Sequence, residues 1–470
     1  MIKTKLNYLC FFIILFGFIY SCFLGNKYIK KYDFIKNIDG KFKNVYFFSK
    51  EGAVPNYWEE ANRIKKETKE KNFFLTGNKY EVKYLPPRLV FFYYSLINED
   101  IKVNDLETNQ NVFKINNGKF GLILIQNLFY YFSIIILFFA FKKNLPNLNS
   151  FGLIFAIFFL SFEPTLNQWN RVLYSETIFF GFQLLLLSVL VSYNSNPNLK
   201  KILLIAIILS LMYLQRSVSI YYCLIILIYF YLFYRNKLII NFSILISIYV
   251  ITHIFIGYSN LKRDGKFYII PILAKEDLYG YFVPKIIKYH DDQNYIQNFQ
   301  TRHDTVDNLV KKKNLISEDE ISIDDRINLA NLNFKESIKI IYSYPLYSIK
   351  EYFLSSLNYF ILKPNELHFL FENNLKYNGK FYLSDEFKNE KKLKLVYSIF
   401  IYLISIFGFY YLLKAKEFKL IYLLVSSIMY FSLFTLWHKQ SSYLAPVLIY
   451  ISFFFGIGIH AIFKKLHFKL

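Results

Sequence analysis

The feature that most constrains this sequence is a series of apolar segments, each close to the length needed to cross a lipid bilayer. About 20 apolar residues in an α-helix span the hydrocarbon core, and such windows recur from end to end. The composition, 54% hydrophobic and 21% aromatic, is typical of a chain that folds in lipid. The predicted spans are 8–25, 120–141, 150–163, 173–193, 202–215, 217–234, 238–258, 394–413, 420–436 and 441–463.

These segments predict an all-α membrane protein with about ten transmembrane helices and two long outer loops. The first loop, 26–118, is expected to carry interfacial helices, and the second, 259–393, to form a small, mostly helical domain. The chain then divides into a membrane core at 1–258 that includes the first loop, an outer domain at 259–393, and C-terminal membrane helices at 394–470.

Basic residues gather on one side of the predicted spans. The short segments on that side are 1–7, 142–149, 194–201, 235–237, 414–419 and 464–470. They hold fourteen Lys and Arg against one acid, Glu417, which is the bias of cytoplasmic loops. Both termini are therefore expected in the cytoplasm, with 26–118 and 259–393 outside. The second of these loops is nearly neutral, with 20 Lys and Arg and 19 Asp and Glu. The net charge of +22 thus indicates topology and contact with membrane lipids, not nucleic-acid binding.

One apolar stretch, 346–362, leaves an alternative topology open. Lys350 and Glu351 interrupt it, so we expect a helix at the membrane interface rather than a span. If it crossed the bilayer, every later segment would change sides and the basic bias would fail. Residues 326–343, just before it, are expected to form a helix, and the polar clusters at 291–325 a solvated loop.

Cysteine and histidine usage does not predict a metal site. Cys10, Cys22 and Cys223 all lie in apolar segments, and the seven His residues are scattered without an HExxH motif. The sequence also lacks a Gly-rich loop of the nucleotide-binding type. We therefore predict no cofactor and leave metal dependence open.

Several polar residues near the predicted membrane boundary share the outer side. They are Glu51, Arg88, Glu176, Arg216, His438 and Lys439. Because the topology was assigned from inner Lys and Arg alone, their grouping is partly independent support for an outward-facing site. Arg216 is the only charge between Lys201 and Arg235, and ionisable residues in such places are usually retained for a partner. One interpretation is an ion pair with Glu176, at the start of a helix that Ser175 is expected to cap.

Short motifs follow one another in a recognisable order. The first loop contains Tyr57-Trp58-x-x-Ala61 and Tyr84-Leu85-Pro86-Pro87; later come Ser175-Glu176, Leu214-Gln215-Arg216, and the turn from His438 to Tyr443 before Pro446. In this order the chain resembles the integral-membrane glycosyltransferases of the GT-C fold, in particular the family 39-like enzymes that use polyprenyl-phosphate sugars. The resemblance covers almost the whole chain, and the order of the motifs carries it.

The resemblance implies a hexosyl- or pentosyltransferase on the outer face of a bacterial inner membrane. Its donor would be a polyprenyl-phosphate sugar, and its acceptor a hydroxyl group of a lipid or glycan. The first outer loop would be catalytic, with a carboxylate that takes the acceptor proton. The family places Asp close before the first-loop aromatic; here Pro55-Asn56 stand there, so we predict Glu51 as the base, with Asp39 in reserve. The implied substrate-binding residues are Tyr57, Arg88, Glu176, Arg216, His438, Lys439 and Tyr443.

Other function classes stay open from the sequence. A surface-polysaccharide polymerase or ligase also has many spans and a large outer loop, but relies on outer Arg and His without an early acid. A transporter predicts two similar halves and charges near the bilayer midplane, whereas these charges lie at the outer boundary. A structural membrane protein without chemistry is the remaining alternative, because a fold alone does not imply a function.

Overall fold

The computed structural model describes residues 2–33, 104–106, 110–112, 118–145, 150–170, 175–269, 278–289, 302–314, 321–360, 386–433 and 441–465. These residues are helical apart from short connections and one antiparallel hairpin. The hairpin pairs β1 (Asn104–Leu106) with β2 (Gln110–Val112) inside the first long loop. Apart from this short hairpin, the described residues confirm the all-α prediction. The interfacial helices expected elsewhere in that loop lie outside the described residues.

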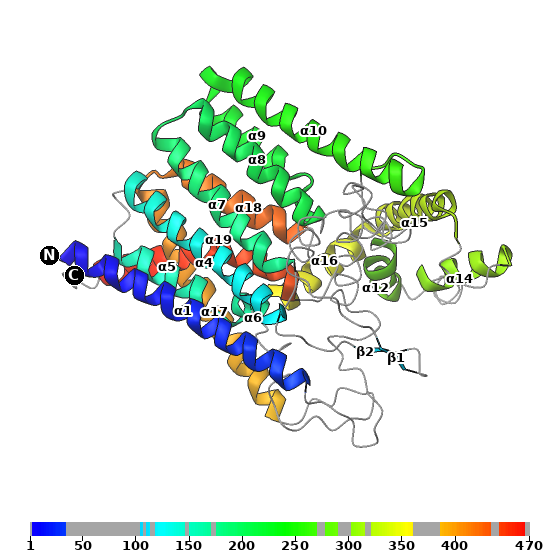
Figure 1. Ribbon diagram of the computed structural model, residues 1–470, viewed down its shortest axis with the longest axis horizontal. Helices are drawn as coiled ribbons and strands as arrows, with labels where there is room; N and C mark the ends of the chain where they lie inside the picture. The colour runs from blue at the N-terminus through cyan, green and yellow to red at the C-terminus, as the bar shows by residue number, and fades with distance from the viewer. Residues whose placement is uncertain are drawn as a thin grey trace.

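A bundle of apolar helices forms the body of the protein (Figure 1). A helix is present at each predicted span: α1 (Ile2–Asp33), α4 (Gly118–Asn144), α5 (Ser150–Phe162), α7 (Glu176–Ser195), α8 (Leu199–Gln215), α9 (Tyr222–Phe233), α10 (Leu238–Asp264), α17 (Glu386–Lys414), α18 (Phe418–Leu433) and α19 (Ser441–Lys465). Within the described residues, six of them, α1, α4, α7, α10, α17 and α19, are long and apolar enough to cross a membrane. The chain is therefore a multi-pass, helical membrane protein.

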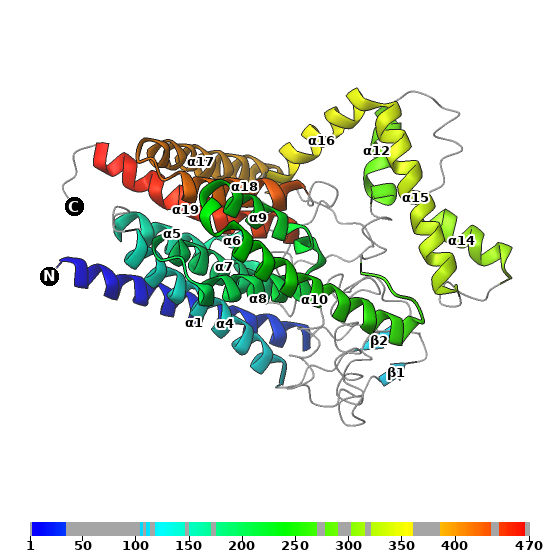
Figure 2. The ribbon, with the colours of Figure 1, turned by 90° about the horizontal axis from the view of Figure 1, so that it is seen from above.

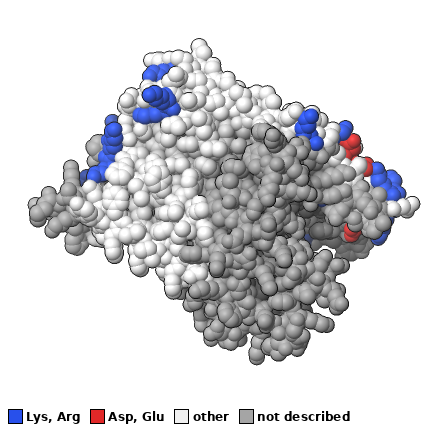
Figure 3. All heavy atoms as spheres, in the orientation of Figure 1, with Lys and Arg blue, Asp and Glu red and all other residues white. Residues whose placement is uncertain are grey.

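The ends of these helices gather at two opposite ends of the bundle (Figures 1 and 2). The start of α1 and the end of α19 lie at the same end of the bundle, as do the adjoining ends of α7 and α8 and of α9 and α10. We call this the terminal end. At the other end, which we call the loop end, α1 and α10 finish and α4 and α17 begin. Lys and Arg side chains are visible at the terminal end in Figure 3. Lys142 and Lys143 lie in the last turn of α4, and Arg235 and Lys237 in a short 3₁₀ turn between α9 and α10.

The last helix, α19, occupies the middle of the bundle. It packs against α5, α17 and α18 and also touches α6 (Pro164–Asn170) and α7. Glycines allow the closest of these approaches. A Cβ on Gly408 of α17 would overlap the carbonyl oxygen of Phe454 in α19, and one on Gly458 would overlap that of Ile404. Small residues at helix contacts let two backbones approach this closely in membrane proteins.

Beyond the loop end lies a small group of helices from the second long loop (Figure 2). A π-helical turn (Leu278–Phe282) leads into α12 (Val283–Tyr289), followed by α14 (Arg302–Lys312), α15 (Ile323–Ser343) and α16 (Pro345–Phe360). The expectation of a solvated loop over 291–325 was wrong where α14 and the start of α15 lie. The helix predicted at 326–343 begins earlier because the Ser322 hydroxyl accepts the Asp325 N–H at 3.2 Å as an N-cap.

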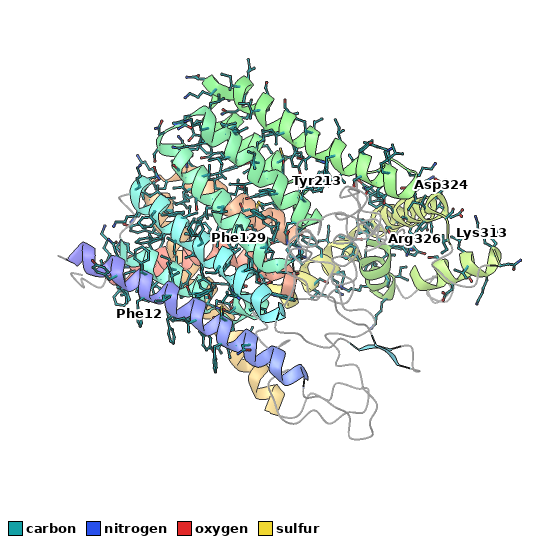
Figure 4. All side chains as sticks on the ribbon, viewed as in Figure 1. Phe12, Phe129, Tyr213, Lys313, Asp324 and Arg326 are labelled. Atoms are coloured by element: carbon teal, nitrogen blue, oxygen red, sulfur yellow. The ribbon has the colours of Figure 1, made fainter. Side chains whose placement is uncertain are left out.

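Ion pairs attach these outer helices to one another and to the bundle. Lys313, just after α14, contacts Asp325 of α15 at 2.5 Å, and Lys266, just after α10, contacts Asp324 at 2.9 Å. Figure 4 shows Lys313 and Asp324 at the far end from α1. The hydrogen bonds from Lys313 and Ser322 hold the pKa of the Asp325 carboxyl below its ordinary value. Between the bundle and this group, α10 ends at Asp264 and is capped by Gly265, whose φ of 73° is the left-handed conformation of a helix C-cap.

Candidate functional site

Only part of the predicted site falls within the described residues. Asp39, Glu51, Tyr57 and Arg88 lie outside them, as do His438 and Lys439. The backbone of Tyr443 lies in the first turn of α19. Glu176 and Arg216 are both described, and the structure brings these two together.

Glu176 and Arg216 form an ion pair at the loop end of the bundle. Glu176 is the first residue of α7, and Arg216 directly follows the last residue of α8, the neighbouring helix. Their closest atoms, Arg216 Nη1 and Glu176 Oε1, are 2.8 Å apart. The side chains are 13% and 4% exposed, so both charges are largely removed from water. The sequence interpretation of an ion pair between these residues is therefore confirmed.

Local backbone structure sets the position of each charge. α8 ends at Gln215 because Arg216 adopts an extended conformation, with φ −146° and ψ 128°, while its N–H still bonds the Met212 carbonyl at 2.9 Å. The extended residue turns its side chain toward the start of α7. There the guanidinium also lies over the Phe179 ring, 5.8 Å from the centroid, which adds a cation–π contact.

Ser175 does not cap α7 in the expected way. It has helical dihedral angles, φ −72° and ψ −16°, and its side chain makes no capping hydrogen bond. Instead its hydroxyl donates to Glu176 Oε2 at 3.2 Å. Its carbonyl accepts the side-chain amide of Gln215 at 3.0 Å. Ser175 thus contacts the carboxylate, and its bond with Gln215 joins the two helix ends that carry the ion pair.

A second set of buried polar residues lies next to this pair, and the sequence analysis had not singled it out. The Asn127 amide of α4 donates to the Asn170 carbonyl at 2.7 Å, and the Thr177 hydroxyl of α7 donates to the Trp169 carbonyl at 2.9 Å. Asn127, Asn170 and Thr177 have no exposed surface. The sequence signal that could have indicated this set is the Gln126-Asn127 pair inside a predicted apolar span. Polar residues in such a span usually contact protein rather than lipid.

The short helix α6 brings Asn170 and Trp169 into this position. Glu163, 3% exposed, precedes it and accepts the Leu166 N–H at 2.8 Å. Pro164 occupies the first helical position, which needs no N–H donor. An acid followed by proline is a sequence signal for such a helix start, and it explains why α5 stops at Phe162.

The centre of the site is a guanidinium held against a carboxylate, both largely buried at the loop end of the bundle. A buried ion pair costs several kcal/mol in lost hydration, so stability is a weak reason to keep one in an apolar bundle. Arg216 presents a planar, always charged guanidinium, and Glu176 compensates and orients that charge. The described residues contain no group of three or more His, Cys, Asp or Glu arranged to hold a metal ion. Comparison with protein-family models, curated proteins and solved structures found no match to this chain.

Proposed function

We propose that this protein is an integral-membrane glycosyltransferase that moves a hexosyl or pentosyl group from a polyprenyl-phosphate donor to a hydroxyl of a lipid or glycan acceptor. The observation that carries the proposal is the buried Glu176–Arg216 pair, with its 2.8 Å contact, at the end of the bundle where both long loops join. A lipid-linked donor is held by its isoprenoid chain in the membrane, so its phosphate reaches the same level as this pair.

The chemistry assigns a role to each part of the site. The acceptor oxygen attacks the anomeric carbon, the bond to the phosphate oxygen breaks, and the polyprenyl phosphate leaves with the electron pair. The acceptor proton passes to a carboxylate, for which we propose Glu51, with Asp39 as the alternative. Arg216 holds the donor phosphate with help from Arg88 or Lys439, while Tyr57, Glu176, His438 and Tyr443 complete the substrate site. We propose no cofactor.

The same proposal includes a topology. The apolar helices cross a bacterial inner membrane ten times, with both termini in the cytoplasm and the loop end outside. Two observations support it: helices occupy all the predicted spans, and among the described residues on the face seen in Figure 3 the basic ones at the terminal end lie without acidic neighbours, whereas those at the opposite end lie among Asp and Glu. A site at the outer end suits a donor that has already been moved across the membrane, because nucleotide sugars stay in the cytoplasm.

Cysteine labelling is expected to show this orientation directly. Lys200 at the terminal end and Asn308 on α14 are both exposed, whereas the native Cys10, Cys22 and Cys223 are buried and give little background. In cells treated with an impermeant maleimide, Asn308→Cys should be labelled from outside and Lys200→Cys only after permeabilisation. Labelling of Lys200→Cys but not Asn308→Cys in intact cells would reverse the proposed topology.

One assay tests both the transfer activity and the identity of the catalytic base. The purified chain in liposomes should release polyprenyl phosphate from a polyprenyl-phosphate sugar when an acceptor is present. Glu51→Gln keeps the shape of the side chain but removes its basicity, so the rate should fall by about 10²–10⁴-fold, with Asp39→Asn near normal. The reverse result would move the base to Asp39. Full activity in both variants would argue against this mechanism, and solute movement without release of polyprenyl phosphate would indicate a transporter.

A further inference from the structure

The helix α16 has its polar side turned into the protein. Ser348 and Glu351 are only 5% and 6% exposed. The Glu351 carboxylate contacts Lys285 of α12 at 3.3 Å and accepts the Ser355 hydroxyl at 2.5 Å. Lys285 also donates to the Ser355 hydroxyl at 3.2 Å. The acid that interrupts this apolar stretch in the sequence is therefore neutralised inside the protein and places no charge on the outer surface of the helix.

The opposite side of α16 is apolar and exposed. Leu346, Ile349 and Phe353 are 79%, 54% and 62% exposed, and their spacing of three and four residues puts them on one helix face. Tyr347 and Leu354, each 37% exposed, lie at one edge of that face. Among the exposed residues from 346 to 354, Lys350 is the only charged one. This is the reverse of a helix on a water-soluble domain, whose polar side faces outward.

α16 is joined to a helix that carries an exposed apolar stripe of its own. The C-terminal end of α16 is joined to α17 by the Tyr402 hydroxyl, which donates to the Phe360 carbonyl at 2.7 Å. α17 is one of the helices long and apolar enough to cross the membrane. Its outward stripe includes Val396, Phe400 and Leu403, each more than half exposed. Figure 2 shows α16 leaving the loop end of the bundle obliquely toward α15.

We propose that α16 lies in the surface layer of the bilayer at the loop end, with Leu346, Ile349 and Phe353 among the acyl chains of the adjacent leaflet. Its 16 residues extend about 24 Å, which is less than the ~30 Å of the hydrocarbon core, so the helix rests in one leaflet. Lys350 can extend its charged group to the lipid phosphates while its stem stays in the apolar layer.

This inference does not depend on the proposed glycosyltransferase activity. It follows from the distribution of polar and apolar side chains around α16 and from the attachment of α16 to α17. Its consequence is that the outer group of helices is held on the membrane surface, through the Glu351–Lys285 contact on one side of α16 and lipid on the other. An amphipathic helix placed in this way binds with a strength that scales with its buried apolar area.

Nitroxide labels test the placement in the full chain, reconstituted in vesicles of phosphatidylethanolamine and phosphatidylglycerol. Ile349→Cys and Phe353→Cys report on the proposed lipid face, and Asn308→Cys on the exposed face of α14 is the aqueous control. Collisions of the label with oxygen, which concentrates in lipid, are compared with collisions with a water-soluble nickel chelate. Oxygen should dominate at 349 and 353, and the nickel chelate at 308.

Two results would overturn the proposal. Strong nickel collisions at both 349 and 353 would place the face in water. Spin–spin broadening that disappears on dilution with unlabelled protein would show a second copy of the chain covering it. Both substitutions replace exposed side chains, so loss of fold is not expected, and size-exclusion chromatography and circular dichroism of each variant check this before labelling.

Discussion

Transfer from a polyprenyl-phosphate sugar is expected to fall by at least about 10²-fold when Arg216 is replaced by lysine, the loss typical of removing one preorganised charge contact. Lysine keeps the positive charge and can still contact Glu176, so the fold should survive. It cannot make the paired, planar contacts that a guanidinium makes with phosphate oxygens. The measurement is the initial rate of polyprenyl phosphate release at equal amounts of folded protein.

Reversing the ion pair separates its structural role from phosphate binding. Glu176→Arg combined with Arg216→Glu keeps one cation and one anion at the ends of α7 and α8 and should restore much of the stability lost in Arg216→Ala. That single change leaves a buried carboxylate unpaired and should cost about 3–5 kcal/mol. Transfer activity should stay low in the double variant, because position 216 then carries a carboxylate instead of the guanidinium that is proposed to bind the phosphate. Normal transfer by Arg216→Lys or by the reversed pair would remove the phosphate role from Arg216.

Gly408→Ala is expected to destabilise the bundle strongly. The added methyl group would overlap the backbone carbonyl of Phe454, and neither helix can give way there without moving its neighbours. Overpacking usually costs about 1–3 kcal/mol, and a backbone clash should reach the upper part of that range. Gly458→Ala should behave alike because its methyl group would overlap the Ile404 carbonyl.

Gly257→Ala is the matched control for this prediction. The methyl group there would meet the ring of Phe267, a side chain that is 56% exposed and free to swing outward. Thermal unfolding in detergent, followed by the fraction that stays monodisperse, should show a large loss for Gly408→Ala and a small one for Gly257→Ala. Equal transition temperatures for the two variants would contradict the role assigned to the Gly408–Phe454 contact.

The positions of the membrane helices could be predicted because hydropathy alone limits where a chain can lie in lipid. The helices α7 and α18, for example, begin within a few residues of the predicted spans at 173–193 and 420–436. The pairing of Glu176 with Arg216 could also be predicted, because the predicted topology puts both residues at the outer ends of neighbouring spans. Both inferences follow from the positions of the helix ends, which hydropathy and the basic residues indicate.

Features that depend on how helices rotate against each other could not be predicted in this way. The contact between Asn127 and Asn170 depends on which side of α4 faces α6, and the hydropathy of α4 is nearly uniform around its axis. Lys350 and Glu351 indicated an interfacial helix at 346–362, but the direction of the Glu351 side chain depends on its partner Lys285, which lies more than sixty residues earlier in the chain. The short helix α14 was not predicted because its sequence is rich in charged residues, which are also typical of a solvated loop.

The central place of α19 also has a consequence for biosynthesis. α5 ends at residue 162 and α19 begins at residue 441, so roughly 280 residues must be translated between two helices that pack together. At about 5–20 residues per second, α5 waits roughly 15 to 55 s in the membrane before its partner emerges from the ribosome. During that interval its Gly152 face contacts lipid or the insertion machinery. A stop codon early in the last helix therefore removes the centre of the bundle and releases a protein whose other helices are already inserted, which makes it a substrate for quality-control proteases.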